Sequence, residues 1–235
     1  DQSGKLLDTW GHQFPGAHGL TLTNENGTEF LFITDTVKHQ VYKTTMDGRI
    51  LLTIDVPFET GVYKKAEEFI PTETTIDSNG DIFIADGYGS QYVIQYDKAG
   101  KLKSFFGGRG DGDQHLDNAH GIIIDRRNST PSLLVTDRTR NCFKRFSMEG
   151  KLEEVIKLPG ACVCRPVIKG DYLYAAVLRS PDLNKENSGF TTILDRNNKV
   201  VSNIGGSEPV YQDGFLQPMM KAEKKVLNPT TVGGD

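Results

Sequence analysis

Short runs of hydrophobic and β-branched residues recur along the chain at a nearly constant interval, separated by Gly, Asn and Asp. Three similar copies each contain four such runs, and the second run of each copy ends in Asp35, Asp86 or Asp137. A fourth copy is more divergent and carries a polar insertion over residues 179–188. Short β-rich runs bounded by turn residues predict strands. The shared aspartates are expected to be turn residues that accept hydrogen bonds from nearby backbone amides.

The repeat predicts an all-β fold, a six-bladed β-propeller of which this chain covers about four to five blades. Four antiparallel strands per copy, repeated around an axis, form the blades of such a fold. One blade cannot bury both of its faces, so neighbouring blades must cover each other. No amphipathic helical stretch separates the runs, which excludes an α/β fold, and only residues 63–69 are expected to form a helical turn.

We expect a single propeller domain over residues 1–235. Both ends of the chain fall within the repeat pattern, so the chain is expected to be part of a longer protein. Its blades are predicted at residues 12–54, 65–107, 114–158 and 162–204, with residues 1–11 and 205–235 in incomplete flanking blades.

Composition narrows the choice of partners. The formal net charge is −4, which argues against a nucleic-acid partner, since such a partner requires a basic face. The chain has no apolar run long enough for a membrane span. We expect a monomer whose partner is a small-molecule or peptide substrate. The three cysteines, Cys142, Cys162 and Cys164, form no C-x-x-C pair and are expected to be buried free thiols, although a disulfide to Cys142 is an alternative.

Residues that differ between the copies are the better functional candidates. His18 and His120 occupy the start of the first run in copies one and three, and copy two has Thr72 there. The innermost strands line the central axis, so the two imidazoles should converge, as a zinc ion requires. The structural alternative is that each histidine donates to a backbone carbonyl. Tyr88 and Arg138 follow the second run, where a packed aromatic residue and a surface arginine are the structural alternatives.

These residues resemble NHL repeats and, more narrowly, the peptidyl-α-hydroxyglycine α-amidating lyase family. The resemblance covers roughly residues 10–157 and rests on the stretches 17–20, 33–35, 39–43, 69–72, 84–88, 119–122 and 135–138. It implies a six-bladed propeller with a zinc ion held by three histidines, of which His18 and His120 match two. The third belongs to a later blade that this chain does not reach.

The resemblance also assigns other residues and an activity. Tyr88 matches the catalytic tyrosine, Arg138 matches an active-site arginine, and the backbone oxygen of Leu20 matches a ligand of a structural calcium ion. The implied reaction is metal-dependent cleavage of the C–N bond of an α-hydroxyglycine-type substrate to an amide and glyoxylate. Zinc would act there as a Lewis acid and Tyr88, as tyrosinate, would act as general base.

The chain departs from that family at its disulfide, because Gly89 and Ile70 stand at the cysteine positions. Relatives without this disulfide resemble bacterial secreted proteins, so we expect a secreted or periplasmic location. The alternative function is a non-catalytic NHL-type β-propeller that serves as a binding or interaction platform. A propeller hydrolase is a third alternative.

Overall fold

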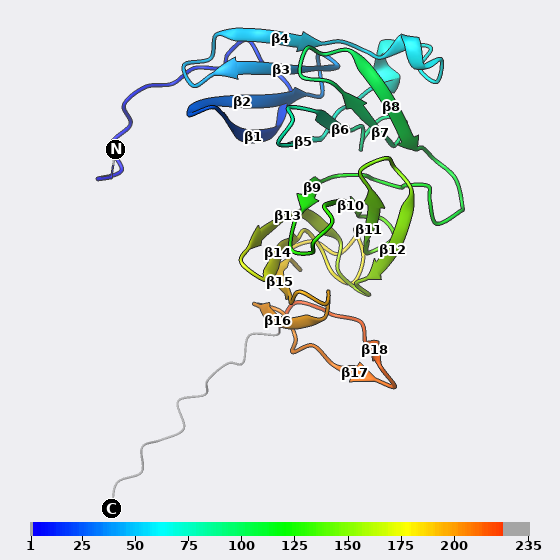
Figure 1. The fold of residues 1–235 in the computed structure, drawn as a ribbon. Coiled ribbons are helices and arrows are strands. Elements are labelled where there is room, and N and C mark those ends of the chain that lie inside the picture. The colour runs from blue at the N-terminus through cyan, green and yellow to red at the C-terminus, as the bar shows by residue number, and fades with distance from the viewer. Residues whose placement is uncertain (1, 223–235) are drawn as a thin grey trace, which may run out of the picture.

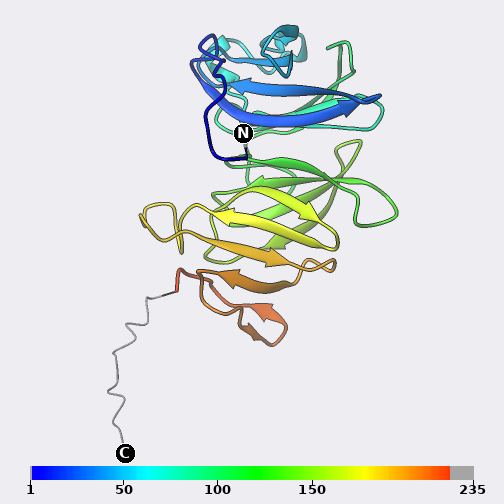
Figure 2. The same ribbon diagram turned by 90° about the vertical axis from the view of Figure 1, so that its left-hand side faces the viewer.

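The computed structural model describes residues 2–222, and this part of the chain forms four four-stranded antiparallel sheets in a β-propeller arrangement, with one further two-stranded sheet (Figure 1). The predicted all-β propeller is therefore confirmed. The sheets follow one another in chain order, and the same succession is visible in the turned view (Figure 2). Residues 1 and 223–235, part of the expected flanking segments, lie outside the described residues.

Each sheet is one blade of four strands paired in sequence order. Blade 1 contains β1 (Ala17–Glu25), β2 (Thr28–Asp35), β3 (Gln40–Thr45) and β4 (Ile50–Ile54). Blade 2 contains β5 (Glu73–Ile76), β6 (Ile82–Ala85), β7 (Tyr92–Tyr96) and β8 (Leu102–Gly107). Blade 3 contains β9 (Ile122–Asp125), β10 (Ser132–Asp137), β11 (Cys142–Ser147) and β12 (Leu152–Lys157). Blade 4 contains β13 (Val163–Lys169), β14 (Tyr172–Val177), β15 (Phe190–Leu194) and β16 (Val200–Ile204), and a short hairpin of β17 (Tyr211–Gln212) and β18 (Phe215–Leu216) follows.

Helical structure is limited to two 3₁₀ turns between blades 1 and 2, η1 (Phe58–Thr60) and η2 (Ala66–Glu68), within the described residues. The second lies inside the segment 63–69, where the sequence predicts a helical turn. Neither is long and apolar enough to cross a bilayer, and no other helix occurs in residues 2–222.

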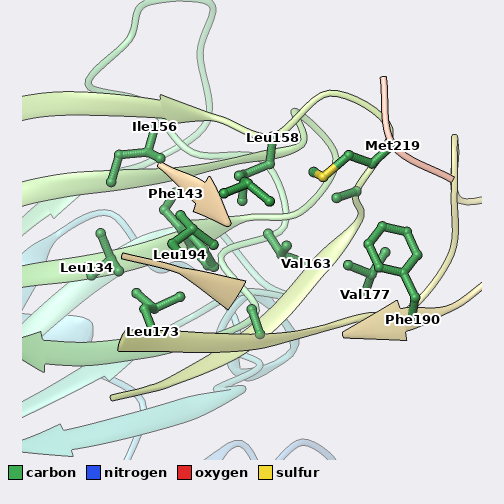
Figure 3. Close-up of a cluster of buried hydrophobic side chains, with 13 residues drawn as sticks. Leu134, Phe143, Ile156, Leu158, Val163, Leu173, Val177, Phe190, Leu194 and Met219 are labelled. Atoms are coloured by element: carbon green, nitrogen blue, oxygen red, sulfur yellow. The ribbon is translucent and has the colours of Figure 1, made fainter. Parts of the chain in front are cut away.

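Hydrophobic side chains alternate between the two neighbours of each blade. In β6, Ile82 and Ile84 pack with blade 1, whereas Phe83 and Ala85 pack with blade 3. A strand points successive side chains to opposite faces, so one strand contributes to two cores. Figure 3 shows the core between blades 3 and 4, where Leu134 and Phe143 meet Leu173, Val177 and other apolar side chains. The cores therefore lie between blades, as the repeat requires.

Glycine recurs in the hairpin that joins the last two strands of blades 1, 2 and 3. Gly48, Gly100 and Gly150 have φ values of 86°, 82° and 86°, and each donates its amide to the carbonyl three residues earlier. Only glycine adopts this conformation without steric cost. The pairing of the last two strands shifts by one residue in these blades, because the hairpin introduces a bulge.

In the fourth copy, the most regular hydrophobic run is not the innermost strand of the blade. The most regular run, Tyr172–Val177, is β14 and not the innermost strand of blade 4. The innermost strand is β13. It contains Cys164, Arg165 and Pro166, so its sequence lacks the regular hydrophobic pattern that predicts a strand. The innermost strands β1, β5, β9 and β13 are neighbours in succession and line the axis.

A buried ionic network joins blade 3 to blade 4. The Asp125 carboxylate pairs with Arg127 at 2.8 Å and with Arg145 at 3.0 Å. Arg127 also donates to the Asp195 carbonyl at 2.9 Å and to the Asn198 side chain at 2.9 Å, which links the two blades. Burial alone would raise the pKa of Asp125, but the hydrogen bonds and charge of the two arginines outweigh it and lower the pKa to about 2.

Asp125→Ala should lower the free energy of unfolding by about 3–5 kcal/mol, because it leaves two buried guanidinium groups without their shared carboxylate. Urea unfolding at neutral pH measures this change. The control is Asp77→Ala, which removes the partner of the half-exposed Arg126 and should cost less than about 1 kcal/mol. An equal loss of unfolding free energy in the two variants would contradict a stabilising role for the Asp125 network.

Candidate functional site

Strand register defines one equivalent position at the entrance of each innermost strand. Leu20 pairs with Ile33, Thr74 with Ile84, Ile122 with Val135, and Pro166 with Ala175. Two residues before these positions stand His18, Thr72, His120 and Cys164, one from each blade. We call these four residues the rim position. A kink between Ala17 and Leu20, matched by one between Val163 and Pro166, breaks the pairing there.

Two residues of the rim position, His18 and His120, lie close to Tyr88, so three of the residues that the sequence selects come together. The ring centroids of His18 and His120 lie 4.9 Å apart, and Tyr88 lies 5.0 Å from His18 and 5.5 Å from His120. These residues come from blades 1, 2 and 3, and the two histidines are about a hundred positions apart in the chain. We call this group the axial trio.

Hydrogen bonds assign the proton on His18. Its Nδ1 lies 2.8 Å from the carbonyl oxygen of Thr72, which can only accept, so Nδ1 carries the hydrogen. In the neutral ring the remaining nitrogen, Nε2, is an acceptor, and it lies 3.2 Å from the hydroxyl of Tyr88, which then donates to it. The Thr72 carbonyl thus fixes both the tautomer and the ring orientation. The structural role expected as an alternative therefore exists for His18, and it leaves Nε2 aimed at the trio.

His120 is held as a neutral imidazole. Burial, the positive charge of Arg138 and the neighbouring His18 together lower the pKa of His120 to about 3. Its Nδ1 is buried and has no hydrogen-bond partner among the described residues. Unpartnered buried nitrogens are costly and usually have a functional reason. His120 therefore differs from a histidine that merely satisfies a carbonyl.

Tyr88 lies in a loop that is held in place by hydrogen bonds to the buried carboxylate of Asp86. Asp86 accepts hydrogen bonds from the amides of Ile70 at 2.7 Å and Ser90 at 2.6 Å, and from the Tyr63 hydroxyl at 2.8 Å. A Cβ on Gly89 would lie 2.1 Å from the Asp86 carboxylate, so only glycine fits there. The loop is thereby pinned, and the Tyr88 ring remains 38% exposed at the axis.

Arg138 is buried, in contrast to the surface position that the sequence left open. It is 5% exposed, and its only side-chain hydrogen bond in residues 2–222 is a weak contact of 3.6 Å to the sulfur of Cys164. Its Nε has no partner, and no carboxylate of the described residues pairs with its guanidinium. A buried guanidinium without a counter-charge is energetically costly, and its planar set of donors matches the geometry of a carboxylate.

The other predicted ligand, the backbone oxygen of Leu20, has a different partner. The guanidinium of Arg165 donates to this oxygen at 2.8 Å. Sequence reasoning also missed Cys164, which was expected to be a buried thiol. It is a free thiol, as are Cys142 and Cys162, but it is partly exposed beside Arg138. An alignment of the fourth copy that began with β13 would have predicted that Cys164 and Arg165 lie on the axis.

The imidazoles of His18 and His120 are side chains of the type that binds zinc, so residues 2–222 supply two candidate ligands. Neutral imidazole is a common zinc ligand, and the Thr72 carbonyl acts on His18 as an orienting partner of the type that supports such ligands. Catalytic zinc sites use three protein ligands. No cluster of three His, Cys, Asp or Glu side chains with metal-binding geometry occurs in the described part of the chain.

The family follows from a match to residues 68–208, more than half of the chain, by a family model described as a 6-bladed beta-propeller. The chain belongs to this six-bladed propeller family. Two peptidyl-alpha-hydroxyglycine alpha-amidating lyases of Drosophila melanogaster are 35% and 33% identical over 45% and 43% of this chain. A probable lyase of this name from Caenorhabditis elegans is 33% identical over 42%. The matched segments span 19%, 24% and 27% of these relatives, respectively.

Solved structures support the propeller fold of this family member. The virginiamycin B lyase of Staphylococcus aureus has a TM-score of 0.57 at 16% identity, over 82% of this chain and 56% of that chain. The hydrazine synthase of Kuenenia stuttgartiensis has a TM-score of 0.59 at 16% identity, over 88% of this chain and 54% of that chain. At these identities the likeness concerns the fold alone.

The loop that carries Tyr88 should respond to pH through Asp86. Burial raises the pKa of Asp86 to about 7, against the opposing hydrogen bonds from Ile70, Tyr63 and Ser90. The folded protein therefore keeps this proton where the unfolded chain has lost it. The stabilisation is complete below about pH 4 and disappears as the pH rises through about 7.

The free energy of unfolding of the wild type, minus that of Asp86→Asn, should fall by about 2 kcal/mol between about pH 5 and about pH 7. The asparagine does not titrate, so the difference isolates residue 86. Urea unfolding of both proteins across this range measures it. Curves that remain parallel over the whole range would show that Asp86 is already ionised in the folded protein.

Proposed function

We propose that the axial trio and Arg138 form the active site of a lyase that cleaves the C–N bond of an α-hydroxyglycine-type substrate to an amide and glyoxylate. The observation that carries the proposal is the convergence of His18, Tyr88 and His120, which differ from the repeat, at ring distances of 4.9–5.5 Å. The lyase names of relatives at 33–35% identity support the reaction class.

The reaction needs a group that moves one proton within the substrate. The hydroxyl on the α-carbon loses its proton, the oxygen electron pair forms the carbonyl of glyoxylate, and the C–N bond breaks. The departing nitrogen keeps the bonding pair and takes up a proton. Tyr88, acting as tyrosinate, accepts the hydroxyl proton and returns it to this nitrogen, so that atoms and charge balance. Its phenol oxygen lies 3.2 Å from His18 Nε2, next to the imidazoles that would hold the zinc ion.

Arg138 provides the binding energy for the carboxylate that this class of substrate carries beside its hydroxyl. Its buried guanidinium lacks a carboxylate partner among the described residues, so an incoming carboxylate would restore a charge-assisted pair. His18 and His120 would hold a zinc ion through their imidazoles, and that ion would supply Lewis-acid polarisation of a substrate oxygen. The neutral state of His120 favours such binding, because only the neutral ring has a free lone pair.

Tyr88→Phe should lower kcat for the release of glyoxylate from a peptide that ends in α-hydroxyglycine by about 10²–10⁴-fold, because the group that transfers the proton is lost. Glyoxylate formation by the full-length protein measures this effect, with metal content determined on the same samples. The matched control, Tyr172→Phe, removes a half-exposed hydroxyl on β14 and should retain wild-type activity. A fully active Tyr88→Phe variant would refute the assigned role.

His120→Ala should abolish zinc binding by the full-length protein while the cores between the blades remain intact, since the imidazole lies at the rim position. Metal analysis and thermal unfolding measure the two effects separately. His12→Ala, which removes an exposed imidazole, should leave the metal content unchanged. A wild-type protein that folds without metal and releases no glyoxylate would favour the non-catalytic binding platform instead.

A further inference from the structure

A second layer of axial residues lies one position further along each innermost strand. The register places Gly19, Glu73, Gly121 and Arg165 there, in blades 1 to 4. The long side chains of blades 2 and 4 meet, with Arg165 Nη1 3.2 Å from the Glu73 carboxylate. The alternation of glycine with a charged residue sets this layer apart from the rim position, which holds the axial trio's histidines.

The two glycines provide the space that the charged side chains occupy. A Cβ on Gly19 would lie 2.8 Å from the Glu73 carboxylate and 2.5 Å from the Thr72 carbonyl oxygen. A Cβ on Gly121 would lie 2.5 Å from the Cα of Arg165. Neither space could accommodate any larger residue without displacement of backbone. The layer therefore depends on all four blades.

The guanidinium of Arg165 contacts three oxygen atoms, from Glu73, Leu20 and Thr21. Besides Glu73, its guanidinium contacts the Leu20 carbonyl oxygen at 2.8 Å and the Thr21 hydroxyl at 3.4 Å. These contacts connect residues 145 and 144 positions apart, from blade 4 to blade 1. A carbonyl, a hydroxyl and a carboxylate are the oxygen ligands that a hard divalent cation such as calcium prefers.

Glu73 requires a positive partner, because its side chain is 5% exposed and its Oε1 accepts from the Thr21 hydroxyl and the Thr74 amide. A buried carboxylate that loses its counter-charge is strongly destabilising. The guanidinium of Arg165 supplies that charge and several donors in a fixed plane, and it is more weakly hydrated than an ammonium group.

We propose that Arg165 is a built-in cation that occupies an oxygen site suited to a divalent metal ion. It thereby holds blades 1, 2 and 4 together on the axis, and the protein needs no calcium ion at the Leu20 carbonyl. The proposal is independent of the lyase activity, since none of its residues belongs to the axial trio.

Replacing Arg165 should convert this layer into a calcium site. The melting temperature of the full-length wild-type protein should be the same with and without added calcium chloride when the zinc concentration is held constant. Without added calcium, Arg165→Ala should melt lower than the wild type. Its melting temperature should rise by about 5–10 °C at calcium concentrations about 100-fold above the Kd. Magnesium should have a smaller effect, because it demands a stricter octahedral geometry.

Three variants serve as controls. Arg165→Lys keeps the internal charge and should not respond to calcium. Arg165→Ala combined with Glu73→Gln removes both charges, so it should fold and also not respond. Arg126→Ala removes a half-exposed arginine paired with Asp77 and should behave like the wild type.

Two results would overturn the proposal. One is a calcium-dependent rise in the melting temperature of the wild type that Glu73→Gln abolishes, which would mean that calcium binds while Arg165 is present. The other is an Arg165→Ala variant without any calcium response. If this variant fails to fold without added calcium, its refolding yield becomes the readout: recovery on adding calcium supports the proposal, and failure to recover overturns it.

Discussion

A four-stranded blade has two apolar faces and no means of covering either one itself, and the rest of the structure depends on this constraint. Alternate residues of β6 and β10 serve two different cores, so each blade is stable only between its neighbours. The same stacking forces β1, β5, β9 and β13 to run side by side at the centre. Side chains at equivalent positions of distant segments therefore meet on the axis.

The repeat was enough to predict the fold, the role of Asp35 and Asp86 as acceptors of backbone amide hydrogen bonds, and the proximity of His18 to His120. Each of these depends on local patterning or on equivalent positions, which a sequence displays directly. Blade 4 was harder, because β13 carries Cys164, Arg165 and Pro166 where a regular strand would have apolar residues. The sequence could not show that Arg138 is buried without a carboxylate partner in residues 2–222, since that depends on which side chains surround it.

The axis separates two kinds of electrostatic environment. Beside the rim position, the neutral imidazole of His120 and the buried guanidinium of Arg138, which has no carboxylate partner in residues 2–222, leave room for an anionic ligand. One residue further along, the charges of Glu73 and Arg165 compensate each other within the protein. The unpaired guanidinium of Arg138 is therefore available to a ligand, whereas the ion pair of Glu73 and Arg165 stabilises the blades below it.

The rim position lies outside the cores that join the blades, and this has a consequence for how such proteins diversify. His18, Thr72, His120 and Cys164 differ in chemistry, yet they occupy equivalent places in four blades of the same strand order. None of them belongs to the apolar clusters, although Thr72 is buried and donates to the carbonyl oxygens of Ala85 and Ala119. Exchanging either histidine or Cys164 would therefore change the chemistry of the axial surface and leave the packing between the blades in place.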